Sequence, residues 1–239
     1  MADPILIQTL FLATLAGASI PVGAWLGSKP IPFMSDWMDT ETRHGVMAFG
    51  AGALLAAVAL VLIPEGSERL QPAPALFWLV AGGILFALVD ARLSRSKTRL
   101  SQFVAMMMDY LPEALALGAV ITGDLSAAVL VAVLISLQNL PEGYNAMREM
   151  SQDQAGGKGP LLWLFAAMVP LGPLCAVIGL SLPAHLDPAV GAVMMLSAGG
   201  IMYLMFQDIA PQVPLENTML PPLGAVLGFA LGLAGHLLV

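Results

Sequence analysis

Eight stretches of mostly apolar residues, each close to the length of a bilayer-crossing helix, dominate this sequence. Such a helix needs about 20 apolar residues. The stretches are Ile5–Leu26, Gly45–Pro64, Ala75–Ala91, Gln102–Thr122, Leu125–Met147, Pro160–Leu182, Pro188–Ala210 and Leu220–Leu238. Only 10% of the 239 residues are charged, and a chain of this size lacks the interior to bury the 58% that are hydrophobic. We predict an all-α polytopic membrane protein with eight transmembrane helices in a single domain, 1–239.

The basic residues between these stretches predict the orientation of the chain. If the N-terminus is outside, only Arg69 among the lysines and arginines lies outside. The other eight then lie on the inner side, as the positive-inside rule requires. They are Lys29, Arg43, Arg92, Arg95, Lys97, Arg99, Arg148 and Lys158. An even number of helices places both termini outside, and we expect an integral protein of a bacterial inner (plasma) membrane.

Few other partners are expected besides the lipid bilayer. Nine basic residues give no nucleic-acid footprint, and a homodimer is left open. The sequence holds no nucleophile–base pair and no Glu-x-x-His di-metal motif, so we do not expect an enzyme or an organic cofactor.

Two segments share a spacing that indicates an internal repeat. "AGALLAAVALVLIP" begins at Ala51 and "AGGIMYLMFQDIAP" begins at Ala198. Gly52 precedes Pro64 by the same distance at which Gly199 precedes Pro211. The second and seventh helices cross in opposite directions, and inverted repeats are typical of secondary transporters. Chance is the alternative, because glycine and proline are frequent in membrane helices.

The fourth and fifth apolar stretches carry the same Leu-Pro-Glu core and acidic or amide side chains four residues apart. Asp109 and Glu113 share one helical face, and Gln138 and Glu142 repeat that arrangement. The proline before each glutamate cannot donate to the carbonyl four residues back, which leaves further oxygen atoms beside these side chains. Each carboxylate costs about 2.5–3.5 kcal/mol at the centre of a membrane helix.

A divalent cation is the simplest compensation for that cost, since it neutralises carboxylates and binds oxygen directly. The predicted ligands are Asp109, Glu113, Gln138, Asn139 and Glu142. A structural polar network and a proton relay are the alternatives. Asp90, Gln207 and Asp208, near the inner ends of the third and seventh helices, line an exit path or sit in the wet interface.

The two motifs resemble the paired metal-binding helices of the ZIP (Zrt-/Irt-like) divalent-metal transporters. That family reads His-Asn-x-Pro-Glu-Gly in helix four and a His-Asn/Asp-x-Pro-Glu or His-x-x-x-Glu pattern in helix five. This chain reads DYLPEA from Asp109 and QNLPEG from Gln138. The segments "FGAGALLAAVALVLIPEG" from Phe49 and "AGGIMYLMFQDIAPQ" from Ala198 look like the second and seventh helices of the family. The resemblance covers the whole chain and implies eight helices with both ends outside.

The departures from the family pattern change what the resemblance implies. Asp109 and Gln138 stand where the family has its site histidines, and Tyr110 replaces the asparagine of helix four. Val169 stands in place of the helix-six glutamate that contributes to a second metal site in many members. The pair Gln207-Asp208 replaces the usual His-Glu pair of helix seven. The resemblance therefore implies one metal site, with the Tyr110 ring filling the second.

Loss of both imidazoles makes the expected ligand set all oxygen, which suits harder cations. Carboxylate and carbonyl oxygens favour magnesium and manganese, whereas imidazole suits zinc. We expect manganese, iron(II) or magnesium as the transported substrate, and zinc stays open because it accepts carboxylates. The glycine-rich second, third, seventh and eighth helices predict movement of one helix group against the other, and close packing in a static bundle is the alternative. The alternative function is a non-transporting metal sensor or scaffold derived from a transporter.

Overall fold

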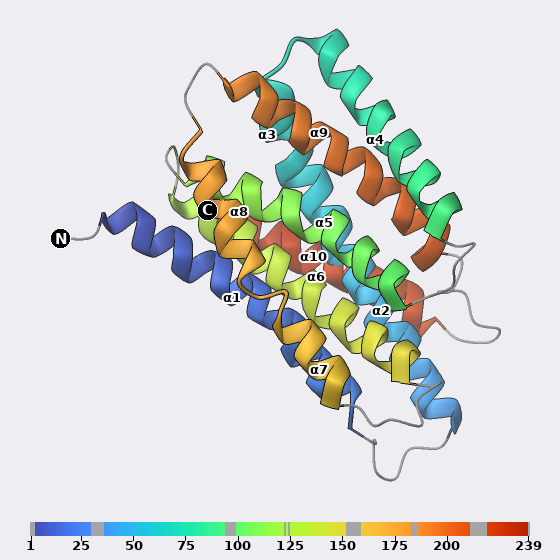
Figure 1. Cartoon of the computed structure of the whole chain (residues 1–239). Coiled ribbons are helices and arrows are strands. Elements are labelled where there is room, and N and C mark those ends of the chain that lie inside the picture. The colour runs from blue at the N-terminus through green and yellow to red at the C-terminus, as the bar shows by residue number, and fades with distance from the viewer. Residues whose placement is uncertain are drawn as a thin grey trace.

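The computed structural model describes residues 3–29, 36–93, 99–121, 123, 125–151, 159–182, 186–210 and 219–238. Every long element in this part of the chain is helical (Figure 1). The elements are α1 (Pro4–Gly27), α2 (Asp36–Ala57), η1 (Val58–Leu62), α3 (Ile63–Glu68), α4 (Pro72–Leu93), α5 (Arg99–Val120), α6 (Leu125–Ser151), α7 (Gly159–Ala166), α8 (Leu171–Leu180), α9 (Asp187–Leu204), η3 (Met205–Ile209) and α10 (Leu220–Leu238).

Seven helical spans in the described residues are long and apolar enough to cross a membrane. They are Pro4–Gly27, His44–Glu68, Pro72–Arg92, Leu125–Arg148, Gly159–Leu180, Asp187–Gln207 and Leu220–Leu238. The remaining long helix, α5, has 22 residues and includes both Asp109 and Glu113. It contacts α6, α8 and α9 within the bundle. The predicted helical membrane protein is therefore confirmed, and the more polar α5 is the eighth long helical unit.

The helix ends show where hydrophobicity alone was a poor guide. The helix that was expected from Gly45 begins at Asp36, because a polar first section extends it. The sixth predicted helix is divided into α7 and α8, and Pro170 and Pro173 lie at the division. Proline has no N–H to donate to the preceding turn, so the regular hydrogen bonding of the helix stops there.

The second and seventh long helices each contain a five-residue π-helical segment at an equivalent place. η1 begins six residues after Gly52, and η3 begins six residues after Gly199. In η1 the N–H of Ile63 donates to the carbonyl of Val58, which is five residues back. Pro64 has no N–H for the carbonyl of Leu60, so the widened turn lies where the regular α-helical ladder is already interrupted.

Four helix pairs are held at close range by a reciprocal arrangement of glycines. Between α1 and α6, Gly23 faces the carbonyl of Leu140, and Gly143, three residues further along α6, faces the carbonyl of Ile20. A Cβ atom at either glycine would overlap the carbonyl that it faces. The same pattern joins α2 to α10, α4 to α9 and α5 to α8. The glycines and facing carbonyls are Gly52–Ala225, Gly228–Phe49, Gly199–Leu79, Gly82–Leu196, Gly118–Ala176 and Gly179–Leu115.

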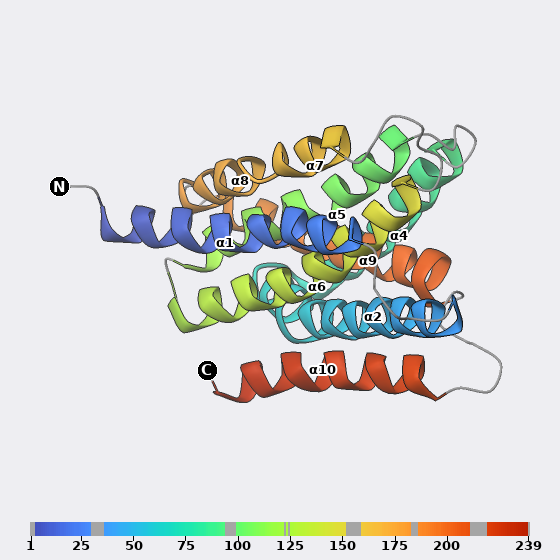
Figure 2. The same cartoon turned by 90° about the horizontal axis from the view of Figure 1, so that it is seen from below.

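These four glycine pairs build two groups of helices. The α6 group consists of α1, α5, α6, α7 and α8, which contact one another. The α9 group consists of α2, α4, α9 and α10 with η1, α3 and η3. The groups meet where α6 contacts α2 and α5 contacts α9. Figure 2 shows α1 beginning and α10 ending at the same end of the bundle. The most buried side chains lie around α5 and α6, where the groups meet.

Candidate metal site

The two Leu-Pro-Glu motifs lie on α5 and α6, which are in contact inside the α6 group. Pro112 lies within α5 and Pro141 within α6, and neither ends its helix. Each proline deprives one carbonyl of its usual donor, that of Met108 in α5 and that of Leu137 in α6. Pro141 also lies against Gly50 of α2, where a Cβ atom would be too close to the proline ring. The α6 motif therefore lies beside the boundary with the α9 group.

Glu113 and Gln138 form the centre of the predicted site. Their side chains are 2% and 1% exposed. The amide nitrogen of Gln138 donates a hydrogen bond to one carboxylate oxygen of Glu113. The other carboxylate oxygen of Glu113 and the amide oxygen of Gln138 have no hydrogen-bond partner among the described residues. Leaving a buried acceptor unpaired costs about 1–3 kcal/mol, so these two oxygens are poised to accept a further ligand.

Two more predicted carboxylates surround this pair. Asp109 is 8% exposed, and Glu142 is half-buried. Glu113 is close enough to both for their charges to interact with its own. Asp109 and Glu142 therefore each interact electrostatically with Glu113, to which Gln138 is hydrogen-bonded. Repulsion between the three acids in a buried location is relieved by protonation or by a cation.

Asn139 is hydrogen-bonded to a different helix from the one that Gln138 contacts. Its amide nitrogen donates to the carbonyl of Ala16 in α1, at a distance of 3.2 Å. Adjacent residues point about 100° apart on an α-helix, so Gln138 and Asn139 serve different neighbours. The amide of Asn139 joins α6 to α1, next to the close contact made by Gly143.

Tyr110 is buried to 1% exposure in the space between α5, α1 and α8. Its hydroxyl lies against Gly17 and Gly172, where any added Cβ atom would overlap it. The hydroxyl is 3.5 Å from the carbonyl oxygen of Val169, to which it donates. Residue 173, the usual donor to that carbonyl, is a proline and has no N–H. Sequence reasoning expected the ring to fill a second metal site, which stays a prediction. It missed the hydrogen bond to Val169, although the spacing from Val169 to Pro173 contained the signal.

The α9 group closes one side of the site. Glu113 borders a cavity of about 10 Å³ together with Ala57, Val61 and Leu62 of the second long helix. The smallest cavity that can hold a water molecule has about 10–15 Å³. Val61 and Leu62 belong to η1, so the π-helical segment forms part of the wall. The carboxylate is therefore covered by apolar side chains from the neighbouring group.

The residues predicted to line an exit path lie elsewhere. Asp90, at the end of α4, accepts a hydrogen bond of 3.0 Å from the hydroxyl of Tyr203 in α9. Gln207 is exposed in η3. The side chain of Asp208 lies outside the described part of the chain. Asp90 thus links two helices of the α9 group, and a role in an exit path stays a prediction.

The donor atoms suit an ion bound by oxygen more than one bound by nitrogen or sulfur. No three described histidine, cysteine, aspartate or glutamate side chains are grouped closely enough to hold a metal ion. An ion here would also need amide or carbonyl oxygens, and Gln138 supplies one that is unpaired. Amide, carbonyl and carboxylate oxygens are the ligands of hard divalent cations. The chemistry of the residues therefore fits such an ion as a transported substrate.

Comparison of the sequence with models of known protein families and with curated proteins gives no match.

Proposed function

We propose that this protein transports a divalent metal cation into the cytoplasm through an oxygen-rich site formed by α5 and α6. The observation that carries the proposal is the buried pair of Glu113 and Gln138, which keeps two unpaired oxygens between helices of a membrane bundle. Asp109 and Glu142 would complete the ligand set after their side chains draw closer to Glu113, because no three described acids are grouped closely enough in this structure to hold an ion. Polar and ionisable groups inside a membrane mark ion pathways more often than structural elements. The resemblance to ZIP transporters belongs to the same proposal.

The proposed transporter has eight crossings arranged as inverted repeats. The glycine pair between α1 and α6 has its counterpart between α8 and α5, and the pair between α2 and α10 has its counterpart between α9 and α4. The spacing is constant within each match: residues 20 and 23 correspond to 176 and 179, and residues 49 and 52 correspond to 196 and 199. The equivalent positions of η1 and η3 support the same relation.

Transport would occur by movement of the α6 group against the α9 group. The glycine pairs all lie inside a group, and none of them joins one group to the other. A site that is covered by η1 is closed while the groups are together. Sliding of one group would uncover Glu113 without breaking any of the close backbone contacts. This arrangement favours a rigid-body mechanism over a continuous channel.

The first experiment measures ion uptake into liposomes that contain the purified protein. Manganese, iron(II), magnesium and zinc are offered side by side, with calcium as a further hard ion. We expect manganese to enter faster than zinc, because the ligand set lacks imidazole. The double variant Asp109→His with Gln138→His should shift the zinc-to-manganese ratio toward zinc. The ratio is the readout, because removing Asp109 also weakens the attraction for every cation.

The outcomes separate two functions. A wild-type protein that moves none of these ions overturns the transport proposal. Two observations favour the alternative, a non-transporting sensor or scaffold. The amide nitrogen of Gln138 is already hydrogen-bonded to Glu113, and the ring of Tyr110 occupies the space beside α8. A sensor would still bind manganese at Glu113, which equilibrium binding to the detergent-purified protein would detect. Equal zinc and manganese uptake would refute the ligand-hardness argument alone.

The proposed orientation has both termini outside and the basic loops inside. Single cysteines placed between Arg92 and Arg99, in a protein whose Cys175 is replaced, provide the test. We expect no labelling of intact cells by an impermeant thiol reagent. Labelling from outside would reverse the orientation and with it the direction of transport.

A further inference from the structure

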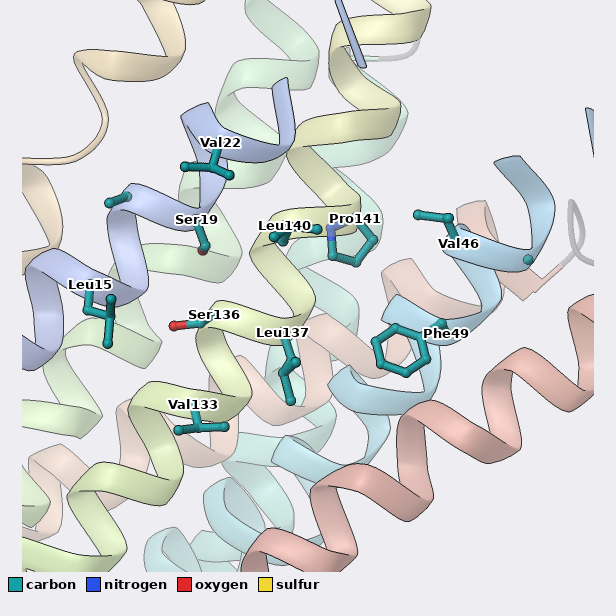
Figure 3. A pocket seen from close by; sticks show the side chains of 12 residues that line it. Leu15, Ser19, Val22, Val46, Phe49, Val133, Ser136, Leu137, Leu140 and Pro141 are labelled. Carbon is teal, nitrogen blue, oxygen red and sulfur yellow. The ribbon is translucent and has the colours of Figure 1, made fainter. Parts of the chain in front are cut away.

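An apolar groove of about 680 Å³ lies between α1, α2 and α6 (Figure 3). Its walls include Leu15 and Val22 of α1, Phe49 of α2, and Val133 and Leu140 of α6. Leu15, Val22 and Val133 are 50%, 48% and 44% exposed, so the groove is open on the outer surface of these helices. All three helices contribute through residues inside their membrane-spanning ranges. The groove therefore opens toward hydrocarbon and not toward water.

The groove offers nothing to a polar ligand. Ser19 and Ser136 carry the hydroxyl groups among its lining residues. Ser19 donates its hydroxyl proton to the carbonyl of Ala16, and Ser136 donates to the carbonyl of Ala132 at 2.7 Å. Both protons are thus used within the helix that carries them. The volume falls within the range of about 300–1,000 Å³ that is usual for ligand pockets.

The α1 face that lines the groove ends at a cation. Leu15 and Val22 are seven residues apart, and Lys29 follows after seven more, so the three lie on one side of the helix. The helical turn continues to Lys29, whose N–H donates to the carbonyl of Leu26 at 3.1 Å. The ammonium group of Lys29 lies 5.0 Å from the centre of the Trp25 ring. An exposed tryptophan beside a lysine is the arrangement that anchors a helix at the level of lipid headgroups.

The distances match one leaflet of a bilayer. Leu15 to Val22 spans about 10 Å of helix, and Val22 to Lys29 about 10 Å more. Half of the hydrocarbon core of a bilayer is about 15 Å thick. A chain whose headgroup is level with Lys29 would therefore reach the Leu15 end of the groove near the middle of the membrane.

We propose that this groove binds one acyl chain of an anionic phospholipid, with the phosphate of that lipid beside Lys29. The charge of Lys29 selects the anionic headgroup, and the apolar walls of the groove bind the acyl chain. The groove lies on the boundary between the two helix groups, since α1 and α6 belong to one and α2 to the other. The lipid is thus a structural ligand of the boundary across which the proposed movement takes place. The binding itself does not depend on the transport proposal.

Gly45 offers a way to fill the groove without disturbing the fold. It lines the groove, and an added Cβ atom would meet no other atom within 4 Å. Gly159, at the start of α7, also has open space around it and does not line the groove. Gly45→Leu is therefore the test variant, and Gly159→Leu is its matched control. Val133→Trp fills the groove from the opposite wall if the first variant does not fold.

The measurement is native mass spectrometry of the full-length protein, stripped of lipid and then incubated with palmitoyl-oleoyl phosphatidylglycerol or phosphatidylcholine. We expect wild type and Gly159→Leu to retain one phosphatidylglycerol that Gly45→Leu loses. Lys29→Gln should reduce the preference for phosphatidylglycerol over phosphatidylcholine about fivefold. Equal retention by wild type and both groove variants would overturn the proposal. A dimer in wild type that becomes a monomer in Gly45→Leu would also overturn it, because a second copy would then be the occupant.

Discussion

The α6 group and the α9 group use the same backbone contacts but place their polar side chains differently. In both groups two helix pairs meet through reciprocal glycines. In the α6 group Glu113, Gln138 and Asn139 are almost wholly buried. In the α9 group the described polar side-chain contacts between helices lie near the ends, where Asp90 meets Tyr203 and Arg69 meets Asp187.

Backbone contacts therefore stabilise both groups, whereas the proposed ion chemistry lies in the α6 group. Close backbone contact between helices needs only glycine and a facing carbonyl, so it takes up no polar side chain. The α6 group can therefore keep Glu113 and Gln138 incompletely paired without losing its helix packing. The α9 group covers the site with apolar side chains from η1, and its described buried acid with an unpaired oxygen, Glu41 of α2, does not line the cavity beside Glu113.

The largest expected effect comes from the glycine pairs. We expect Gly143→Val in the α6 group and Gly199→Val in the α9 group to lower the unfolding free energy by about 3 kcal/mol or more each, because a carbonyl oxygen occupies the space of the new side chain. Unfolding in mixed detergent micelles measures this. Gly159→Val is the control, because that glycine has open space around it and lies outside the groove, and we expect no loss of this kind there. A much smaller loss in one group would show that the shared contact pattern does not have a shared energetic role.

Glu113→Gln is expected to separate function from stability. The substitution removes a proposed ligand charge, so metal uptake should fall by about 100-fold, the upper end of the loss seen for residues that only support a metal ligand. Unfolding free energy should be unchanged or higher, because a buried charge is costly. Uptake assays and unfolding curves on the same preparation check both. Asp187→Asn, an exposed carboxylate of the α9 group, should leave uptake unchanged and lower the unfolding free energy by no more than about 0.5 kcal/mol through its ion pair with Arg69. Undiminished uptake by Glu113→Gln would remove this residue from the ion pathway.

Tyr203→Phe tests a polar contact within the α9 group. It removes the hydroxyl that donates to Asp90 across α4 and α9. Polar contacts between membrane helices contribute about 0.6 kcal/mol on average, and we expect a loss of that size. A double-mutant cycle with Asp90→Asn isolates the contact. A coupling above about 2 kcal/mol would mean that the α9 group depends on side chains as much as on glycines.

The smallest effect is expected at the other end of this group. Arg69 contacts Glu65 at 2.6 Å and the exposed Asp187 at 3.0 Å. Arg69→Gln should cost about 0.2–0.5 kcal/mol, and high salt should reduce the difference. Partial burial lowers the pKa of Arg69, but the hydrogen bond and charge of Glu65 and then Asp187 outweigh it, so the pKa lies above its ordinary value. The contribution is therefore complete at neutral pH and is lost only at strongly alkaline pH, as the pH rises through the raised pKa. A clear change between pH 6 and pH 9 in wild type but not in Arg69→Gln would contradict this.

The sequence was a good guide to the helices because apolar length is a strong signal. The last helix begins and ends at the predicted residues, Leu220 and Leu238. The early start of the second helix at Asp36 was missed, since hydrophobicity describes only the part of a helix that lies in lipid. Among 24 glycines, the eight that form the reciprocal pairs could not be identified without knowing which helices are neighbours.

For the candidate site, spacing of four residues predicts that Asp109 shares a helical face with Glu113 and that Gln138 shares one with Glu142. The hydrogen bond from Gln138 to Glu113 joins two helices, so spacing within one helix could not predict it. Asn139 was included because its side chain has the right chemistry, yet its amide bonds to Ala16. The sequence around the two motifs did not predict that Val61 and Leu62 cover Glu113, because they belong to a helix about fifty residues away in the chain.

The glycine pairs also set the order in which the protein can assemble during synthesis. Each pair joins a helix that precedes residue 121 to a helix that follows residue 124: α1 with α6, α5 with α8, α4 with α9 and α2 with α10. The first four long helices therefore leave the ribosome without any of these partners. As the later helices emerge, the pairs can close in the order α6, α8, α9 and α10. A chain arrested after α5 would present four open glycine faces to the membrane quality-control machinery, whereas a complete chain presents none.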